Sequence, residues 1–190
     1  NGYYMGQRGF AGKWSHHEES LRVPLIVYDP RLAAERKGTW CDATSLNIDL
    51  PALMLDLADL DVPKHYTGRS LLPLVRGEKP SDWRTDFFCE HLMHNKSIPK
   101  WEGVRGARYK YARYIDQDPV YEEVYDLQQD PHEIENLAKR PRYYQLLRQL
   151  REKCNELRDE VGGIWIPWSD DHLPPARRKV RKPNEYWMNR

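Results

Sequence analysis

The first 24 residues bring together side chains that can bind a metal ion or an anion. They include the amide of Asn1, the lysine Lys13, the histidine pair His16 and His17, the glutamate pair Glu18 and Glu19, and the arginines Arg8 and Arg22. An amide oxygen is a neutral ligand for a hard cation such as calcium. Lysine and arginine side chains can hold an anion as a point charge or as a bidentate fork. The stretch therefore predicts a site where a metal ion and an anionic substrate meet.

Glycines and a short apolar run set the backbone around these groups. Gly2, Gly6, Gly9 and Gly12 permit tight turns and a close approach to a ligand. Residues 23–28 form an apolar run that predicts a strand buried on both faces. A polar loop that feeds a buried strand is where α/β enzymes often place ligand-binding groups.

The same stretch resembles the type I sulfatases of the alkaline-phosphatase-like superfamily. The resemblance rests on Asn1-Gly-Tyr-Tyr, on Gly12-Lys13-Trp14 and on Glu18-Glu-Ser-Leu-Arg-Val-Pro24, which follow one another in the order of the family motif. It implies that Asn1 is a calcium ligand, beside carboxylates that lie upstream of this chain. It also implies that Lys13 binds the sulfate group, whereas most lysines are simply surface residues.

Arg22 and His17 are further candidates for contact with the substrate. Arg22 could hold an anion bidentately, or it could pair with Glu18 or Glu19. We favour the ion pair, because charges near a core are usually matched. His16 and His17 stand where many relatives carry an aromatic residue, and neighbouring histidines rarely bind a metal without further ligands. We therefore expect no metal at the pair and consider His17 a substrate contact.

A second group of candidates lies in the middle of the chain. His91 and the loop at residues 98–102 could reach the mouth of the active site. There Trp101 would stack on a sugar or aryl group, and Lys100 or His91 would attract its anion. The alternative is that Trp101 packs on the sheet, and the sequence does not separate the two.

The nucleophile of such an enzyme is not found in this chain. The resemblance implies a formylglycine made from Cys or Ser in the pattern Cys/Ser-x-Pro-x-Arg. Cys41, Cys89 and Cys154 lack that context, and Ser97-Ile-Pro-Lys-Trp101 lacks the arginine. We therefore expect the formylglycine upstream, and we expect residues 1–190 alone to be inactive.

Composition limits the other classes of function. The chain has 190 residues, and its 30 Lys and Arg against 29 Asp and Glu give a net charge of +1. No overall field therefore points to nucleic acid or to an anionic membrane. No run is long enough for a membrane span. The compartment is open, although the resemblance favours export to the periplasm or the outside of the cell.

Hydrophobic periodicity predicts the elements that must position these groups. Leucines at a spacing of three and four residues predict a helix over residues 49–60, and a longer apolar stripe predicts one over 141–161 that ends at Val161. A third helix is expected to start at Asp130-Pro131. Aromatic and β-branched residues predict four strands, at 86–91, 102–105, 109–115 and 122–127.

The second half of the chain extends the resemblance to about residue 160. It is carried by Trp101-Glu-Gly-Val-Arg105, Tyr109-Lys-Tyr111 and the signature from Tyr125 to Ala138. The resemblance implies an α/β enzyme whose C-terminal part, α+β in itself, is a four-stranded antiparallel sheet packed by a long helix. We expect residues 1–80 to be a remnant of the catalytic domain, residues 81–163 the C-terminal subdomain, and residues 164–190 a tail.

Other interpretations remain open. The chain could belong to a phosphodiester or phosphonate hydrolase of the same superfamily, or it could be a non-catalytic binding module with a basic tail at residues 177–182. In the sulfatase interpretation the substrate is a sulfated carbohydrate or other small sulfate ester. Because the apolar run at 23–28 needs cover, we also expect a homo-oligomer or a disordered first half.

Overall fold

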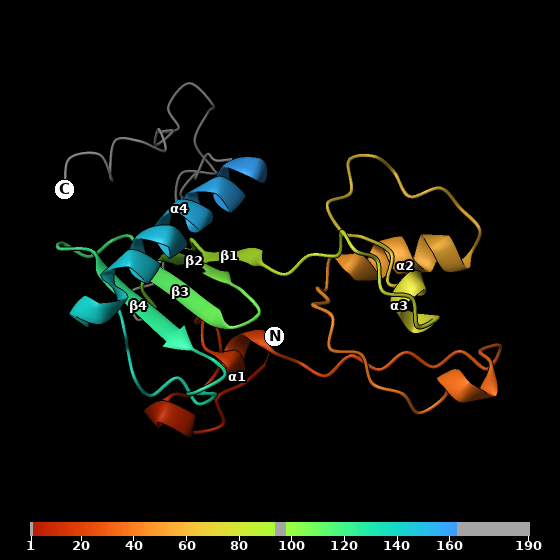
Figure 1. The fold of residues 1–190 in the computed structure, drawn as a ribbon, viewed down its shortest axis with the longest axis horizontal. Coiled ribbons are helices and arrows are strands. Elements are labelled where there is room, and N and C mark those ends of the chain that lie inside the picture. Colours follow the sequence, from red (N-terminus) through yellow and green to blue (C-terminus); the bar gives the residue numbers. More distant parts are fainter. Residues whose placement is uncertain (1, 94–97, 163–190) are drawn as a thin grey trace. The chain divides into compact units, whose positions relative to one another are not determined.

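The computed structural model describes residues 2–93 and 98–162, and these form two compact units (Figure 1). One unit combines the described residues up to Val23 with those from Asp86 onward, and the other is Pro24–Thr85. The packing therefore divides at Val23, whereas we expected the first 80 residues to stay together. Their assignment as a remnant of a catalytic domain stays a prediction. The expected tail lies outside the described residues.

The larger unit is built on a sheet whose four strands follow one another in space as in the sequence. They are β1 (Phe87–His91), β2 (Trp101–Arg105), β3 (Tyr109–Tyr114) and β4 (Tyr121–Asp126), all antiparallel. Each begins and ends within two residues of its predicted position. The four-stranded antiparallel sheet is thus confirmed.

The helix α4 (Tyr144–Glu160) covers one face of this sheet (Figure 1). A short 3-10 turn, η3 (Pro141–Tyr143), precedes it. The core between α4 and the sheet contains Val104, Tyr111, Val124, Leu137, Ala138, Leu147 and Cys154. Val161 was expected to end the apolar stripe, but the helix ends at Glu160 and Val161 is 61% exposed. The long packed helix is confirmed apart from that last residue.

The N-terminal segment, residues 2–22, covers the opposite face of the sheet. Side chains alternate between the two faces of a strand. Val104 faces α4, so Trp101 and Arg105 point the other way, and there they meet the backbone of Trp14 and the carboxylate of Glu18. The segment is mostly loop, with η1 (Gln7–Gly9) and the single turn α1 (Glu18–Leu21). The sheet is thus enclosed between α4 and this segment.

Two predicted elements are not formed. Residues 23–28 are not a strand, and Val23, Leu25, Ile26 and Tyr28 are exposed, Ile26 by 88%. An apolar run becomes a buried strand only when neighbouring strands pair with it, and none does so among the described residues. The expected helix at Asp130 is a turn instead. Asp130 accepts hydrogen bonds from the backbone N–H groups of Glu133 and Glu135, and Glu133 has φ +51°.

The smaller unit is organised around α2 (Asp49–Leu57) and α3 (Leu72–Val75), with η2 (Ala34–Arg36) in the preceding loop. Its core contains Leu53, Leu71, Leu72 and Leu74. The predicted start of α2 at Asp49 is confirmed. The helix ends at Leu57 rather than Leu60, because Asp59 turns the chain with φ +54°. In the described part of the chain, no helix combines the length and apolar character needed to cross a membrane.

Candidate functional site

An ion-pair network holds the N-terminal segment on the sheet. Lys110 of β3 lies 2.6 Å from Glu18 and 2.6 Å from Glu133, measured from its Nζ to one carboxylate oxygen of each. The other oxygen of Glu133 accepts the backbone N–H of Glu18 at 2.8 Å. Burial raises the pKa of Glu18, but the Lys110 ammonium and the Arg105 guanidinium together outweigh it, so the net pKa lies below the usual value. The network fixes the backbone just beyond the histidine pair.

Arg8 closes the same network from the loop side. Its guanidinium contacts the Glu19 carboxylate at 3.2 Å and donates to the backbone carbonyl of Glu133 at 2.9 Å. Glu18 and Glu19 are therefore paired with Lys110 and Arg8. The ion pair that we expected between Arg22 and these glutamates is not formed, and Arg22 lies exposed at the surface. Its alternative role, in contact with a substrate anion, stays a prediction.

His16 is buried against the sheet face opposite α4. It is 1% exposed, and its ring lies against Trp101, Tyr114 and Tyr125. Its Nε2 lies 2.5 Å from Glu123 Oε2 and 2.9 Å from the Tyr114 hydroxyl. Its Nδ1 is also buried but has no hydrogen-bond partner among the described residues.

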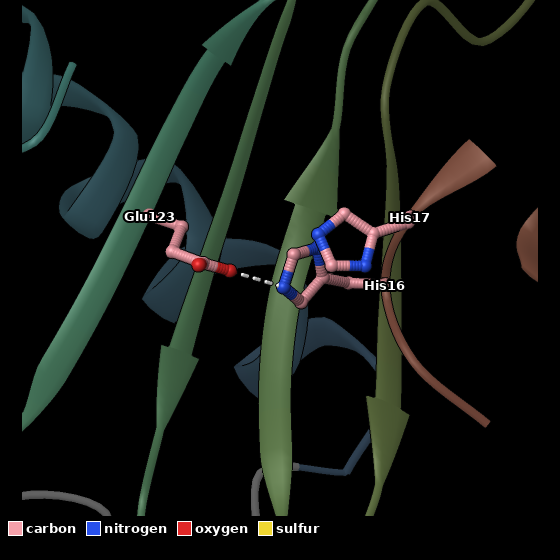
Figure 2. A group of neighbouring side chains, drawn as sticks. All are labelled: His16, His17 and Glu123. Carbon is pink, nitrogen blue, oxygen red and sulfur yellow. Dashed lines mark ion pairs between the residues drawn. The ribbon is translucent and has the colours of Figure 1, made fainter. Parts of the chain in front are cut away.

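His17 packs directly on His16, with the ring centroids 4.2 Å apart (Figure 2). Its Nδ1 lies 2.7 Å from the hydroxyl of Tyr4, which also contacts Ser15. Burial, followed by the neighbouring charges of His16 and Arg8, lowers the pKa of His17 to about 3. Its imidazole is therefore neutral at ordinary pH. At 7% exposure, His17 faces protein rather than solvent in this structure, and the predicted contact with substrate stays a prediction.

The described residues do not offer a calcium site. Asn1, the predicted ligand, lies outside the described residues. In the described ranges, a grouping of three metal-ligating side chains occurs at His16, His17 and Glu123. Calcium takes six to eight oxygen ligands, so two imidazoles and one carboxylate do not fit it.

Lys13 lies in the N-terminal segment, next to the ring of Tyr3. Its Nζ is 5.4 Å from the centre of that ring, and the side chain is partly exposed. Gly12, with φ +87°, turns the backbone just before it. A lysine ammonium over an aromatic ring is attracted electrostatically to the face of the ring. The position is compatible with holding an anion, and that role stays a prediction.

The other predicted site residues lie at the end of the sheet next to Trp14. His91 stacks on Trp14 with the ring centroids 5.7 Å apart, and burial lowers its pKa. The Trp101 indole donates to the Trp14 carbonyl at 2.9 Å and is only 3% exposed. It packs on the sheet in this structure, and its stacking on a sugar stays a prediction. Lys100 is 8% exposed and lies 3.5 Å from Asp116.

A separate groove of about 860 Å³ opens on the α4 side of the sheet. Its lining includes Glu122, Lys139, Tyr144, Arg148 and Arg151. Arg151 already pairs with Glu122. Because the groove and Lys13 belong to opposite faces of the sheet, it is not part of the site predicted from the sequence.

The sequence analysis missed the residues that organise this face. Lys110 and Tyr114 of β3 and Glu123 of β4 point to the sheet face opposite α4. The strands that contain them were predicted from the sequence, but these three side chains were given no role. The available signal was their polarity in otherwise aromatic strands. A strand residue that is charged and buried needs a charged partner, and here that partner comes from the N-terminal segment or from Glu133.

Comparison with known proteins places most of the chain in one group. The family model described as N-sulphoglucosamine sulphohydrolase, C-terminal, matches residues 6–160. The Delta 4,5-hexuronate-2-O-sulfatase of Bacteroides thetaiotaomicron is 34% identical over 183 residues, which is 88% of this chain and 38% of that protein. The multifunctional alkaline phosphatase superfamily protein PehA of Trinickia caryophylli is 30% identical over 169 residues, which is 81% of this chain and 32% of that protein.

A solved structure shares the fold as well. It is a protein in complex with its substrate, D-glucosamine-2-N,6-O-disulfate, and it aligns with a TM-score of 0.75 at 26% identity. The alignment covers 84% of this chain and 32% of that one. The chain thus spans about a third of the length of the curated relatives that it matches.

Proposed function

Because the chain belongs to the N-sulphoglucosamine sulphohydrolase C-terminal family, we propose that it is the C-terminal part of a sulfatase, a hydrolase of sulfate esters. The family match over residues 6–160 is the observation that carries this proposal. The expected membership of the sulfatases is confirmed by it. The expected fold, the C-terminal part of an alkaline-phosphatase-like sulfatase, is confirmed by the structural similarity.

The proposed substrate is a sulfated carbohydrate of the glycosaminoglycan type. Two similar proteins support it: one is a hexuronate-2-O-sulfatase, and the other was solved with a disulfated glucosamine. Which hydroxyl or amine carries the sulfate group is not part of the proposal. Export of the protein stays a prediction.

The proposed role of this chain in the reaction is to supply positive charge to the sulfate. Lys13 follows the Gly12 turn, and its ammonium lies over the Tyr3 ring. Sulfate transfer spreads negative charge over the sulfuryl oxygens, and a fixed cation stabilises that charge. Arg22, which is exposed and directly follows α1, is a second candidate for the same role.

Two further parts of the proposed enzyme lie outside the described chain. A formylglycine nucleophile and a calcium ion would supply the attack and the polarisation of the sulfate, with Asn1 as one calcium ligand. Cys89 and Cys154 do not substitute for that nucleophile. Burial raises the pKa of both Cys89 and Cys154 to about 12, so their thiols stay protonated.

A phosphonate or phosphodiester hydrolase of the same superfamily is the second candidate. The 30% identity to PehA favours it, because that protein is a multifunctional member of the superfamily. A lysine at position 13 would serve a phosphoryl group as well as a sulfuryl group, since each carries negative charge on its non-bridging oxygens. The lower identity of this relative makes it the weaker candidate.

Release of the anion tests the proposal directly. The intact protein that contains this chain is incubated with 2-O-sulfated, N-sulfated and 6-O-sulfated sugars, and the free sulfate is measured by ion chromatography. Residues 1–190 alone serve as the matched control, and we expect them to release none. Turnover by the isolated chain would overturn the assignment of the nucleophile to another part of the protein.

A further inference from the structure

Three side chains that can bind a metal converge on the sheet face opposite α4. His16 and His17 come from the N-terminal segment and Glu123 comes from β4 (Figure 2). One ligand atom of each lies within 4.8 Å of the others. The three are 1%, 7% and 8% exposed, respectively. The usual objection to a histidine pair, that further ligands are missing, therefore does not apply here.

We propose that His16, His17 and Glu123 bind one divalent transition-metal ion, zinc foremost. Two imidazoles and one carboxylate form a known type of three-residue zinc set, which leaves a fourth position of the tetrahedron for water. Imidazole ligands favour zinc and its transition-metal neighbours over calcium and magnesium, which prefer oxygen. The inference concerns this chain alone and does not depend on sulfatase activity.

The hydrogen bonds of His17 suit a metal ligand. Its Nδ1 lies 2.7 Å from the Tyr4 hydroxyl, and that hydroxyl also contacts Ser15. If Nδ1 donates its hydrogen to Tyr4, the lone pair is left on Nε2. The structure gives Nε2 no hydrogen-bond partner among the described residues. Ligating histidines commonly donate their other N–H to an oxygen in this way, which fixes the ring orientation.

The His16–Glu123 contact is where the metal would enter. Nε2 and Oε2 lie 2.5 Å apart. Two ligand atoms on a tetrahedral zinc ion, each about 2.1 Å from the metal, are separated by about 3.4 Å. Binding would therefore replace this direct contact and move the two groups apart by about one ångström. The Tyr114 hydroxyl, which contacts both groups, is placed to hold the carboxylate after this shift.

The positive charges of Lys110 and Arg8 act on this position, since both contribute, after burial, to the lowered pKa of His17. They are opposed by negative charge close by, because both groups are paired with carboxylates of Glu18, Glu19 and Glu133, and the Glu123 carboxylate belongs to the site itself. The metal would join the N-terminal segment to β4. The ion pair between Glu18 and Lys110 already joins the same segment to β3. It would therefore fix the backbone three residues beyond Lys13.

The experiment measures zinc binding by the 190-residue chain. All samples carry Cys41→Ser, because Cys41 is an exposed thiol that could itself bind zinc. After treatment with a chelator, the chain is titrated with zinc against a chromophoric indicator, and cobalt(II) absorption reports the coordination geometry. His17→Gln and Glu123→Gln are compared with His65→Gln, which removes an exposed histidine elsewhere.

We expect one equivalent of zinc per chain and a tetrahedral cobalt spectrum. His17→Gln and Glu123→Gln should each weaken zinc binding at least tenfold, and His65→Gln less than twofold. In case the variants unfold, histidine NMR signals of the chain with its site residues intact provide a second readout. Zinc should shift the signals of His16 and His17 and leave His65 in place. Absence of saturable binding, or zinc-induced shifts confined to other histidines, would overturn the inference.

Discussion

The ammonium of Lys110 lies 2.6 Å from the Glu133 carboxylate, and each of these side chains is only 1% exposed. Glu133 belongs to the signature after β4, and Glu18, the other partner of Lys110, belongs to the motif at the start of the chain. One buried lysine therefore joins the two stretches on which the family resemblance rests.

Removing the ammonium should destabilise the larger unit strongly. In Lys110→Met, the buried carboxylate of Glu133 and the partly buried one of Glu18 lose their main counter-charge, and breaking a buried pair in this way costs about 3–5 kcal/mol. The free energy of unfolding in urea measures the loss. Lys153→Met is the matched control, because Lys153 makes only an exposed contact of 4.0 Å with Glu156. A loss in Lys110→Met no larger than in the control would contradict the anchoring role.

Asp49 should have the same importance in the smaller unit. It is fully buried, it pairs with Arg84 through both oxygens at 2.5 and 2.8 Å, and it accepts the backbone N–H of Leu46 and of Arg69. Asp49→Asn keeps the shape but removes the charge that Arg84 needs. Hydrogen exchange of the α2 amides should accelerate by a factor of at least ten. Asp61→Asn, at an exposed position, should leave the exchange unchanged, and equal effects would refute the prediction.

The three cysteines should differ sharply in reactivity. Cys41 is exposed, whereas burial raises the pKa of Cys89 and Cys154 to about 12. The thiolate is the reactive species, so only a minute fraction of either buried thiol can react at pH 8. Iodoacetamide followed by mass spectrometry should find Cys41 modified rapidly and the other two only after unfolding in urea. Modification of Cys154 at the rate of Cys41 would show that the core is not formed as described.

Acid should weaken the turn that follows β4. The Arg108 guanidinium, together with the backbone N–H groups of Gln128 and Gln129, lowers the pKa of Asp126 below its usual 3.8. A carboxyl group whose pKa is lower in the folded state stabilises the fold above its unfolded pKa. That contribution is lost as the pH falls below about 3.8 through the folded value.

Asp126→Asn isolates this effect, because an amide oxygen still accepts the two backbone N–H groups. We expect the stability of this variant to fall less between pH 4 and pH 2 than that of the unaltered chain. Glu152→Gln, an exposed position on α4, is the control and should not flatten the profile. Parallel pH profiles for all three proteins would argue against the assigned pKa.

The sequence predicted local elements well and long-range pairing poorly. The strands and α4 were predicted because their periodicity is contained in each short segment. The pairing of Glu18 with Lys110 was not predicted, because Lys110 lies far away in the sequence, on β3. The hydrogen bond between Glu18 and Glu133 was not predicted either, because it spans 115 residues. A single sequence shows that a buried charge needs a partner, but not which residue supplies it.

The failure at residues 23–28 has a different physical cause. Apolar character shows that a segment prefers burial, but the burial itself depends on neighbours that a short segment does not specify. Ile26 and Tyr28 are more than 80% exposed in this structure. The prediction that another copy of the chain covers them in a homo-oligomer therefore stays a prediction.

The measurement that most directly tests the account compares sulfate and phosphonate release by the intact protein, with and without Lys13→Ala. Lys37→Ala, at an exposed position outside the site, is the control. The account predicts that sulfate esters are cleaved at least a hundredfold faster than phosphonate monoesters. It also predicts that Lys13→Ala lowers kcat/KM for the sulfate ester about a hundredfold, as expected for the loss of a charge-stabilising group, while Lys37→Ala does not. Faster cleavage of phosphonates, or full sulfatase activity in Lys13→Ala, would contradict it.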